Sequence, residues 1–169
     1  PARPTPISMA IHSYYNLMGG GPISDHRLQI SADAITPTGP GLIPTGEVAR
    51  VDSTGHDYRR PRLLAEANPD QPATDINFAL TGSDPAAVLT APNGLTLTLR
   101  TDAPGLQLYT GQALKPHGTP LSGQTHAPCT GLALEPQQFP DAPNQPAFPS
   151  AIFTPDRPFR QTTSIEIAP

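Results

Sequence analysis

Apolar and polar residues alternate along most of the chain. This period of two predicts β-strands, because successive side chains of a strand point to opposite faces. Residues 95–100, LTLTLR, place Leu95, Leu97 and Leu99 on one face and threonines and an arginine on the other. Six further segments alternate in the same way: residues 7–17, 27–33, 76–80, 105–111, 131–137 and 160–168. One apolar and one polar face per strand is typical of antiparallel sheets with a buried side and a solvated side.

Turn-forming residues separate the predicted strands. Asn93-Gly94 lies between AVLTAP and LTLTL and is a strong hairpin signal. Further breaks rich in Gly, Pro, Asp and Ser lie at residues 36–41, 52–55 and 101–105. Only residues 61–68, PRLLAEAN, are compatible with a short helical turn. We therefore expect an all-β fold, either an antiparallel sandwich or a barrel, in a single domain that covers residues 1–169.

Composition indicates a small hydrophobic core. The chain of 169 residues has 24 Pro and 14 Gly, which favour turns. Its content of Leu, Ile, Val and Phe lies near the lower edge for a globular chain. The formal net charge is only −4, so disorder driven by charge is not the natural interpretation. We expect a folded β protein that draws stability from a partner or from sequence outside this chain.

Charge and sequence features exclude several classes of protein. The charges are scattered and the pI is about 5.6, so no basic stripe is available to bind nucleic acid. No apolar run approaches the length of a membrane-spanning helix. The single cysteine, Cys129, has no partner for an internal disulfide. The first residues, PARPTPIS, lack the apolar region of a signal peptide and an initiator Met, so we expect the chain to begin inside a longer protein.

Four residues with useful chemistry fall on the polar faces of the predicted strands. They are His12, Asp75, Gln107 and Glu135. Such residues on separate strands of one sheet can converge on a concave, solvated surface. A histidine, two carboxylates and an amide are the groups that general acid–base chemistry on a hydroxylated ligand would use.

Each of these residues also has a structural interpretation. A histidine near tyrosines is more often structural, an Asp at the start of a strand is more often a turn or cap residue, and a strand Gln usually faces solvent. Glu135 stands out because glutamate is depleted in strands. Pro136 follows it directly and fixes the backbone there. The pattern therefore makes Glu135 the strongest candidate without assigning it a role.

Competing motifs are weak. His126 and Cys129, with His117 nearby, offer zinc-type ligands, but no second CxxC and no fourth ligand follow, so we expect no metal site. The glycines at residues 19–21 lack the strand-to-helix context of a phosphate-binding loop. The GxSxG motif of a hydrolase nucleophile is absent.

Five motifs occur in the order found in one known family and together run from end to end of the chain. They are HSYYNL at residues 12–17, the segment of residues 43–61 whose first five residues are IPTGE, DINF at residues 75–78, PGLQLYTG at residues 104–111 and LALEPQQFPDAPNQPAFPS at residues 132–150. In these motifs the chain resembles the C-terminal half of the aldose 1-epimerase (galactose mutarotase) family. The resemblance implies a galactose mutarotase-like antiparallel β-sandwich, incomplete in this chain, with the sugar site on a concave face. It implies an aldose as the small-molecule partner and no metal or other cofactor.

The resemblance also implies a role for each candidate residue. Glu135 would be the general base that removes the proton from the C1 hydroxyl of the sugar, and His12 the general acid that protonates the ring oxygen. Asp75 and Gln107 resemble the family's ligands for sugar hydroxyls. The implied function is interconversion of the α and β anomers of hexoses such as galactose and glucose.

Two positions beside the candidate acid depart from the family pattern. Ile11 stands where the family usually has Asn, and Tyr15 stands where it usually has Phe. Strand alternation places Ile11 on the opposite face from His12, which is compatible with the implied role of His12.

The resemblance covers only half of the family's length. The other half normally adds more of the sandwich, a second histidine and an arginine of the sugar site, and it is a candidate partner for this chain. The alternatives are a non-catalytic carbohydrate-binding β-sandwich and an inactive fragment of an epimerase. A cytoplasmic location is favoured, and a periplasmic one stays open if an N-terminal signal is missing.

Overall fold

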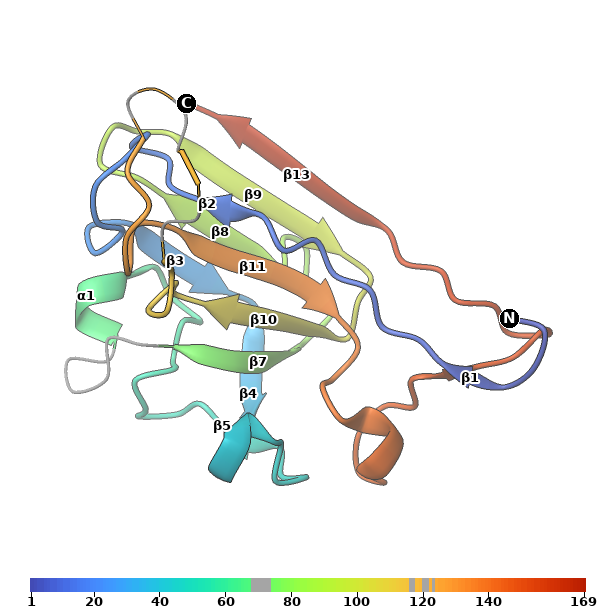
Figure 1. The fold of residues 1–169 in the computed structure, drawn as a ribbon. Coiled ribbons are helices and arrows are strands. Elements are labelled where there is room, and N and C mark those ends of the chain that lie inside the picture. The colour runs from blue at the N-terminus through green and yellow to red at the C-terminus, as the bar shows by residue number, and fades with distance from the viewer. Residues whose placement is uncertain (68–73, 116–117, 120–121, 123) are drawn as a thin grey trace.

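The structure, a computed structural model, consists of two antiparallel β-sheets packed against each other and a separate short ribbon (Figure 1). The described residues are 1–67, 74–115, 118–119, 122 and 124–169. The ribbon pairs β1 (Thr5–Pro6) with β12 (Ile152–Phe153). Within the described residues, no helix is long and apolar enough to cross a membrane. The predicted all-β, antiparallel sandwich is confirmed.

One sheet has six strands, all paired antiparallel. They are β2 (Tyr14–Tyr15), β4 (Ala32–Thr36), β5 (Ala49–Arg50), β7 (Asp75–Leu80), β10 (Gly105–Tyr109) and β11 (Leu132–Gln137). Their order across the sheet is β2-β11-β10-β7-β4-β5. The predicted strands at residues 76–80, 105–111 and 131–137 correspond to three neighbouring strands of this sheet.

The second sheet has five strands, also antiparallel. They are β3 (Arg27–Ile30), β6 (Arg62–Leu63), β8 (Ala87–Thr90), β9 (Thr96–Thr101) and β13 (Thr163–Ala168), in the order β13-β9-β8-β3-β6. The predicted hairpin joins β8 to β9 at Asn93-Gly94. Gly94 has φ +91°, a conformation that glycine adopts without steric cost, and the Leu95 N–H donates to Asn93 Oδ1 at 3.1 Å.

The two sheets bury their apolar faces against each other. Phe78, Leu106 and Leu134 come from the six-stranded sheet and Leu89 and Leu97 from the other, and none is more than 1% exposed. Burial of one such side chain contributes about 1.5–3 kcal/mol. The core therefore fixes which way the central strands face, and it leaves their polar residues on the outer face of the six-stranded sheet.

The strand predicted at residues 27–33 is two strands in two different sheets. β3 and β4 meet at Ser31, whose N–H and hydroxyl both donate to carbonyls of the chain just before β8. Leu28, Ile30 and Ala32 are all buried, as alternation predicted. Apolar and polar residues keep alternating where the chain passes from β3 in one sheet to β4 in the other, because both strands turn their apolar side to the same core. The alternation therefore could not reveal the change of sheet.

The prediction of one strand over residues 7–17 is wrong for most of its length. Only Tyr14–Tyr15 pair with β11, and Met9 and Ile11, which were expected on a buried face, are 63% and 51% exposed. Continued pairing would place Ile11 opposite Pro136, which has no N–H to donate to a neighbouring strand. The ladder therefore stops before that point.

Two smaller expectations also changed. The helical turn expected at residues 61–68 is β6 followed by α1 (Leu64–Ala67), and residue 68 lies outside the described residues. The strand expected at residues 160–168 begins at Thr163. Within the described part of the chain it pairs only with β9, so it forms one margin of its sheet.

His26 supports the segment that leaves β2, and its environment predicts a pH-dependent stability. Its imidazole is fully buried and its Nε2 accepts the Leu17 N–H at 3.2 Å. Burial lowers the pKa of His26 below its usual 6.5, against smaller opposing effects of the Ile23 backbone and Asp25. His26 takes up a proton more readily in the unfolded chain than in the folded one. The contribution of neutral His26 to the free energy of unfolding is therefore fully present above pH 6.5 and decreases as the pH falls below that value.

We expect the free energy of unfolding in urea to decrease between about pH 7.5 and about pH 5.5, where histidines titrate. The decrease should be smaller in His26→Gln, which cannot take up the proton and whose side-chain oxygen can still accept from Leu17. The quantity compared between the two proteins is the change in the free energy of unfolding with pH, so a loss of stability that is the same at every pH does not affect the comparison. Equal slopes in the two proteins would show that His26 does not carry this dependence.

Candidate functional site

A row of polar side chains crosses the outer face of the six-stranded sheet. Gln107 of β10 lies directly opposite Glu135 of β11 on one side and Asn77 of β7 on the other. Asn77 in turn lies opposite Thr36 of β4. Directly opposed residues of antiparallel strands share a face. The register therefore brings Gln107 and Glu135 side by side, on the face away from the core.

A second row, two residues along the strands, lies on the same face. Tyr109 of β10 is opposite Ala133 and Asp75, and Ala133 is opposite Tyr14 of β2. Asp75 is thus one row from Gln107. Three of the four predicted site residues come together through strand register alone.

The fourth, His12, comes from the irregular segment before β2. If the β2–β11 register is extended by two residues, His12 falls opposite Glu135. The segment stays beside β11 because the Gln161 amide donates to the carbonyls of Met9 and Pro136, at 3.3 and 2.9 Å. His12 Nε2 lies 3.4 Å from Glu135 Oε1. The imidazole and the carboxylate therefore form a direct pair.

The two members of this pair differ in their exposure to solvent. The Glu135 side chain is 10% exposed, whereas the His12 side chain is 53% exposed. Burial raises the pKa of Glu135 above its usual 4.5; His12 opposes this and Asp75 adds to it. A carboxylate with a raised pKa accepts a proton more readily, which suits a general base.

Asp75 and Gln107 form a second polar pair beside the first. Gln107 Nε2 donates to Asp75 Oδ1 at 2.7 Å, and Gln137 Nε2 donates to Gln107 Oε1 at 3.4 Å. These bonds orient the Gln107 amide. Among the described residues, the second oxygen of Asp75 and the second amide hydrogen of Gln107 make no hydrogen bond, so an acceptor and a donor are left for a ligand.

A cavity of about 150 Å³ lies against this second pair. Asp75 and Gln107 line it together with Asn77 and Thr36, whose hydroxyl accepts a hydrogen bond from the Asn77 amide at 3.3 Å. A carboxylate, two amides and a hydroxyl offer the donors and acceptors that recognise hydroxyl groups. Glu135 does not line this cavity and lies one strand away from it, across Gln107.

Two tyrosines that were not proposed as site residues lie against the His12 imidazole. The ring centroids of His12 and Tyr14 are 5.2 Å apart, and those of His12 and Tyr109 are 6.3 Å apart. Gly131 allows Tyr14 to pack closely, since a Cβ there would lie 3.2 Å from Tyr14 Cβ. In a strand over residues 7–17, alternation places Tyr14 on the same face as His12, and this is the signal in the sequence that could have identified it.

The alternative zinc site has no support in the described residues. No group of three or more His, Cys, Asp or Glu side chains converges there in a way that would hold a metal ion. His126 and Cys129 are described, whereas His117 lies outside the described residues.

The fold and the polar face define a class: an antiparallel β-sandwich with a paired histidine and glutamate on the outer face of one sheet. The family model described as "Aldose 1-epimerase" matches residues 1–166. Galactose mutarotase of Bos taurus is 39% identical over 96% of this chain, and aldose 1-epimerase of Escherichia coli (strain K12) is 38% identical over 87%. The chain spans about half the length of these relatives, 50% and 46% respectively.

Solved structures agree with these sequence relationships. The GalM/aldose epimerase homologue of C. elegans superposes on 98% of the chain with a TM-score of 0.85 and 25% identity, and the chain covers 52% of it. Galactose 1-epimerase of Lactobacillus acidophilus gives a TM-score of 0.80 at 25% identity, and the chain covers half of it. The chain belongs to the aldose 1-epimerase family.

The contacts of Glu135 predict how its titration responds to substitution. We expect a carboxyl pKa above 4.5, measured by ¹³C NMR on labelled glutamate. The pKa should rise further in His12→Ala, which removes the favourable imidazolium, and should fall in Asp75→Asn, which removes a like charge. Substitution of the exposed Glu47 to Gln is the control and should leave the Glu135 titration unchanged. A Glu135 pKa at or below 4.5, or one insensitive to His12, would contradict the contact described above.

Proposed function

We propose that this chain carries the acid–base pair of an aldose 1-epimerase and interconverts the α and β anomers of hexoses such as galactose and glucose. The observation that supports this most strongly is the 3.4 Å approach of His12 Nε2 to Glu135 Oε1, beside the hydrogen-bonded pair of Gln107 and Asp75. Membership in the family supports this proposal, and the geometry of His12 and Glu135 is compatible with the acid and base roles proposed for them.

The reaction needs a base and an acid close together. Glu135 takes the proton of the C1 hydroxyl while His12 delivers a proton to the ring oxygen, and the C1–O5 bond breaks to give the open-chain aldehyde. Rotation about C1–C2 presents the other face of the carbonyl. The O5 hydroxyl oxygen then attacks C1 and gives its proton back to His12. Glu135 returns its proton to the former carbonyl oxygen, which becomes the C1 hydroxyl of the other anomer. The enzyme ends in its starting protonation state.

The adjacency of the two groups fits this chemistry. The hydroxyl oxygen and the ring oxygen are bonded to the same carbon, so the acid and the base must reach two neighbouring atoms. The sugar therefore binds against His12 and Glu135 together, so that both side chains approach it from one side; it does not lie between them. Asp75 and Gln107 lie beside the pair and would accept from and donate to hydroxyls of the same ring, which fixes its orientation.

We further propose that full activity requires a polypeptide equivalent to the other half of the relatives. β2 and β13 lie at the margins of their sheets and have no outer partner among the described residues. Three large apolar side chains near these margins, Met9, Ile11 and Ile167, are more than half exposed. A free strand margin next to exposed apolar side chains is a surface on which further strands can pair and pack.

Polarimetry of freshly dissolved α-galactose or α-glucose tests the catalytic proposal. We expect the chain to accelerate mutarotation above the buffer rate, and Glu135→Gln to reduce this acceleration by about 100-fold or more, as for loss of a general base. Glu47→Gln, which changes an exposed glutamate away from the pair, is the matched control and should retain the rate.

Other outcomes would redirect the proposal. A rate equal to that of buffer, together with sugar binding in a titration, would favour a carbohydrate-binding module without catalysis. A rate that is identical in Glu135→Gln and Glu47→Gln would exclude Glu135 as the base.

The proposal about the other half has its own test. A separately expressed polypeptide that corresponds to the unmatched half of the bovine relative should raise the mutarotation rate of this chain when the two are mixed. Ile11→Ser combined with Ile167→Ser should weaken that effect, because it removes apolar contact area without touching the pair. A rate that does not depend on the added half would overturn this part of the proposal.

A further inference from the structure

The segment that carries His12 is held at its two ends and has little support between them. Within the described part of the chain, residues 10–13 make no main-chain hydrogen bond. At one end Tyr14 begins the pairing of β2 with β11, and at the other end the Met9 carbonyl accepts a hydrogen bond. The position of the His12 backbone therefore depends on what fixes these two ends.

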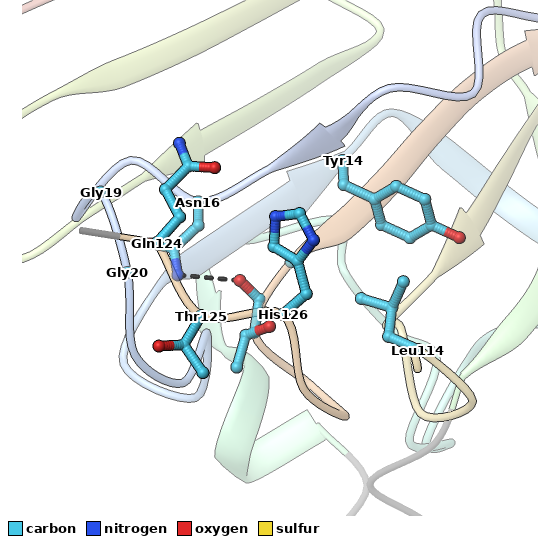
Figure 2. A pocket seen from close by; sticks show the side chains of 10 residues that line it. Tyr14, Asn16, Gly19, Gly20, Leu114, Gln124, Thr125 and His126 are labelled. Carbon is cyan, nitrogen blue, oxygen red and sulfur yellow. Dashed lines mark hydrogen bonds between the residues drawn. The ribbon is translucent and has the colours of Figure 1, made fainter. Parts of the chain in front are cut away.

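The end at β2 is held by strand pairing and by a side-chain amide. The Asn16 amide nitrogen donates to the carbonyls of Gly21 and Thr130, at 2.8 and 3.0 Å, and so ties the turn after β2 to the chain that leads into β11. Asn16 and Tyr14 both line a cavity of about 210 Å³ beside β2, and Figure 2 shows them on either side of the His126 ring. β2 therefore gives the segment one fixed end.

The other end is held by the Gln161 side chain, which bridges two main-chain carbonyls. Gln161 Nε2 donates to the Met9 carbonyl at 3.3 Å and to the Pro136 carbonyl at 2.9 Å. Two carbonyl oxygens cannot bond to each other, whereas an amide NH₂ has two hydrogens and can donate to both. Gln161 thus links the chain three residues before His12 to the residue directly after Glu135.

The backbone beside Gln161 is anchored to the five-stranded sheet. The Thr162 N–H donates to Asp102 Oδ1 at 2.8 Å, and the Thr162 carbonyl accepts the Asp102 N–H at 3.2 Å. Asp102 directly follows β9, whose apolar side chains lie in the core. The Gln161 side chain therefore reaches from a fixed point at the end of β9 to the segments that carry the acid and the base.

The oxygen of the Gln161 amide is not used in this arrangement. Gln161 Oε1 is buried and has no hydrogen-bond partner among the described residues. A buried acceptor without a donor costs free energy, so stability alone does not account for an amide at this position. Local conflicts of this kind are expected where function constrains a residue.

We propose that Gln161 is a positioning residue for the acid–base pair and holds the His12 segment where His12 Nε2 meets Glu135. The proposal rests on the proposed epimerase function, because proton transfer to neighbouring atoms of the sugar requires both groups in place. Without the amide, the Met9 end of the segment is free to move away from β11, and the half-exposed imidazole moves with it. Asp75 and Gln107 lie on other strands and stay in place.

The kinetic test replaces the amide by an apolar side chain of similar length. In Gln161→Met we expect the kcat for mutarotation of galactose to fall by about 10- to 100-fold, the cost of a small misplacement of a reacting group. The KM should stay within about 2-fold, because Asp75 and Gln107 still bind the sugar. Gln161→Asn, which keeps an amide on a shorter side chain, should fall between Gln161→Met and the unsubstituted chain.

Gln29→Met is the matched control. Gln29 is a partly buried glutamine of β3 in the other sheet, and its Nε2 donates to the Arg59 carbonyl at 3.2 Å. The same substitution therefore removes the same kind of hydrogen bond away from the pair, and it should retain the mutarotation rate. In an active chain, a kcat for Gln161→Met equal to that of Gln29→Met would overturn the positioning role.

The titration of Glu135 gives a readout that a general loss of stability does not move. Gln161→Met should raise the Glu135 pKa, as is expected for His12→Ala, because the imidazolium is withdrawn from the carboxylate. In the His12→Ala background, Gln161→Met should have no further effect, since the interaction is already lost. An unchanged Glu135 pKa, or an equal shift with and without His12, would overturn the positioning role. The predicted shifts in a chain that does not accelerate mutarotation would overturn the epimerase function and leave the positioning of the pair standing.

Discussion

The antiparallel register of β11 is the constraint on which the rest of the site depends. β11 lies between β10 and β2, and its pairing decides that Glu135 faces Gln107 on one side and the His12 segment on the other. A slip of one residue would turn Glu135 into the core and bring Leu134 to the polar face. The leucines of the core resist that slip, so the packing on one side of the sheet positions the chemistry on the other.

This arrangement balances stability against chemistry. A glutamate that is almost fully buried loses most of its hydration, and the contact with His12 at 3.4 Å compensates for only part of that loss. The remaining cost makes the carboxylate a better base. His12, by contrast, is half exposed and is held by contacts with tyrosine rings and by a neighbouring segment rather than by strand pairing. Glu135 is thus fixed by the packing of β11 against the core, whereas His12 is fixed by contacts on the outer face of the sheet.

Much of the fold and of the site could be predicted from the sequence because period-two alternation reports directly on strand faces. It placed Asp75, Gln107 and Glu135 on polar faces, and the register of three neighbouring strands brought them together. Alternation failed at residues 7–13, where the partner strand carries a proline, and at residues 27–33, where it continued through a change of sheet. Both failures depend on neighbours that are distant in the sequence.

Pro136 has a consequence that reaches beyond the site. A strand edge without a partner presents free N–H groups to any extended peptide, including a second copy of the same chain. At the residue after Glu135 the backbone has no such group to offer, and the segment that carries His12 lies alongside it. Another molecule that adds a strand to β11 would therefore lose a hydrogen bond there and would also have to displace the histidine. One residue thus both ends the pairing of β2 and disfavours the addition of another strand to the segment of β11 that lies beyond β2.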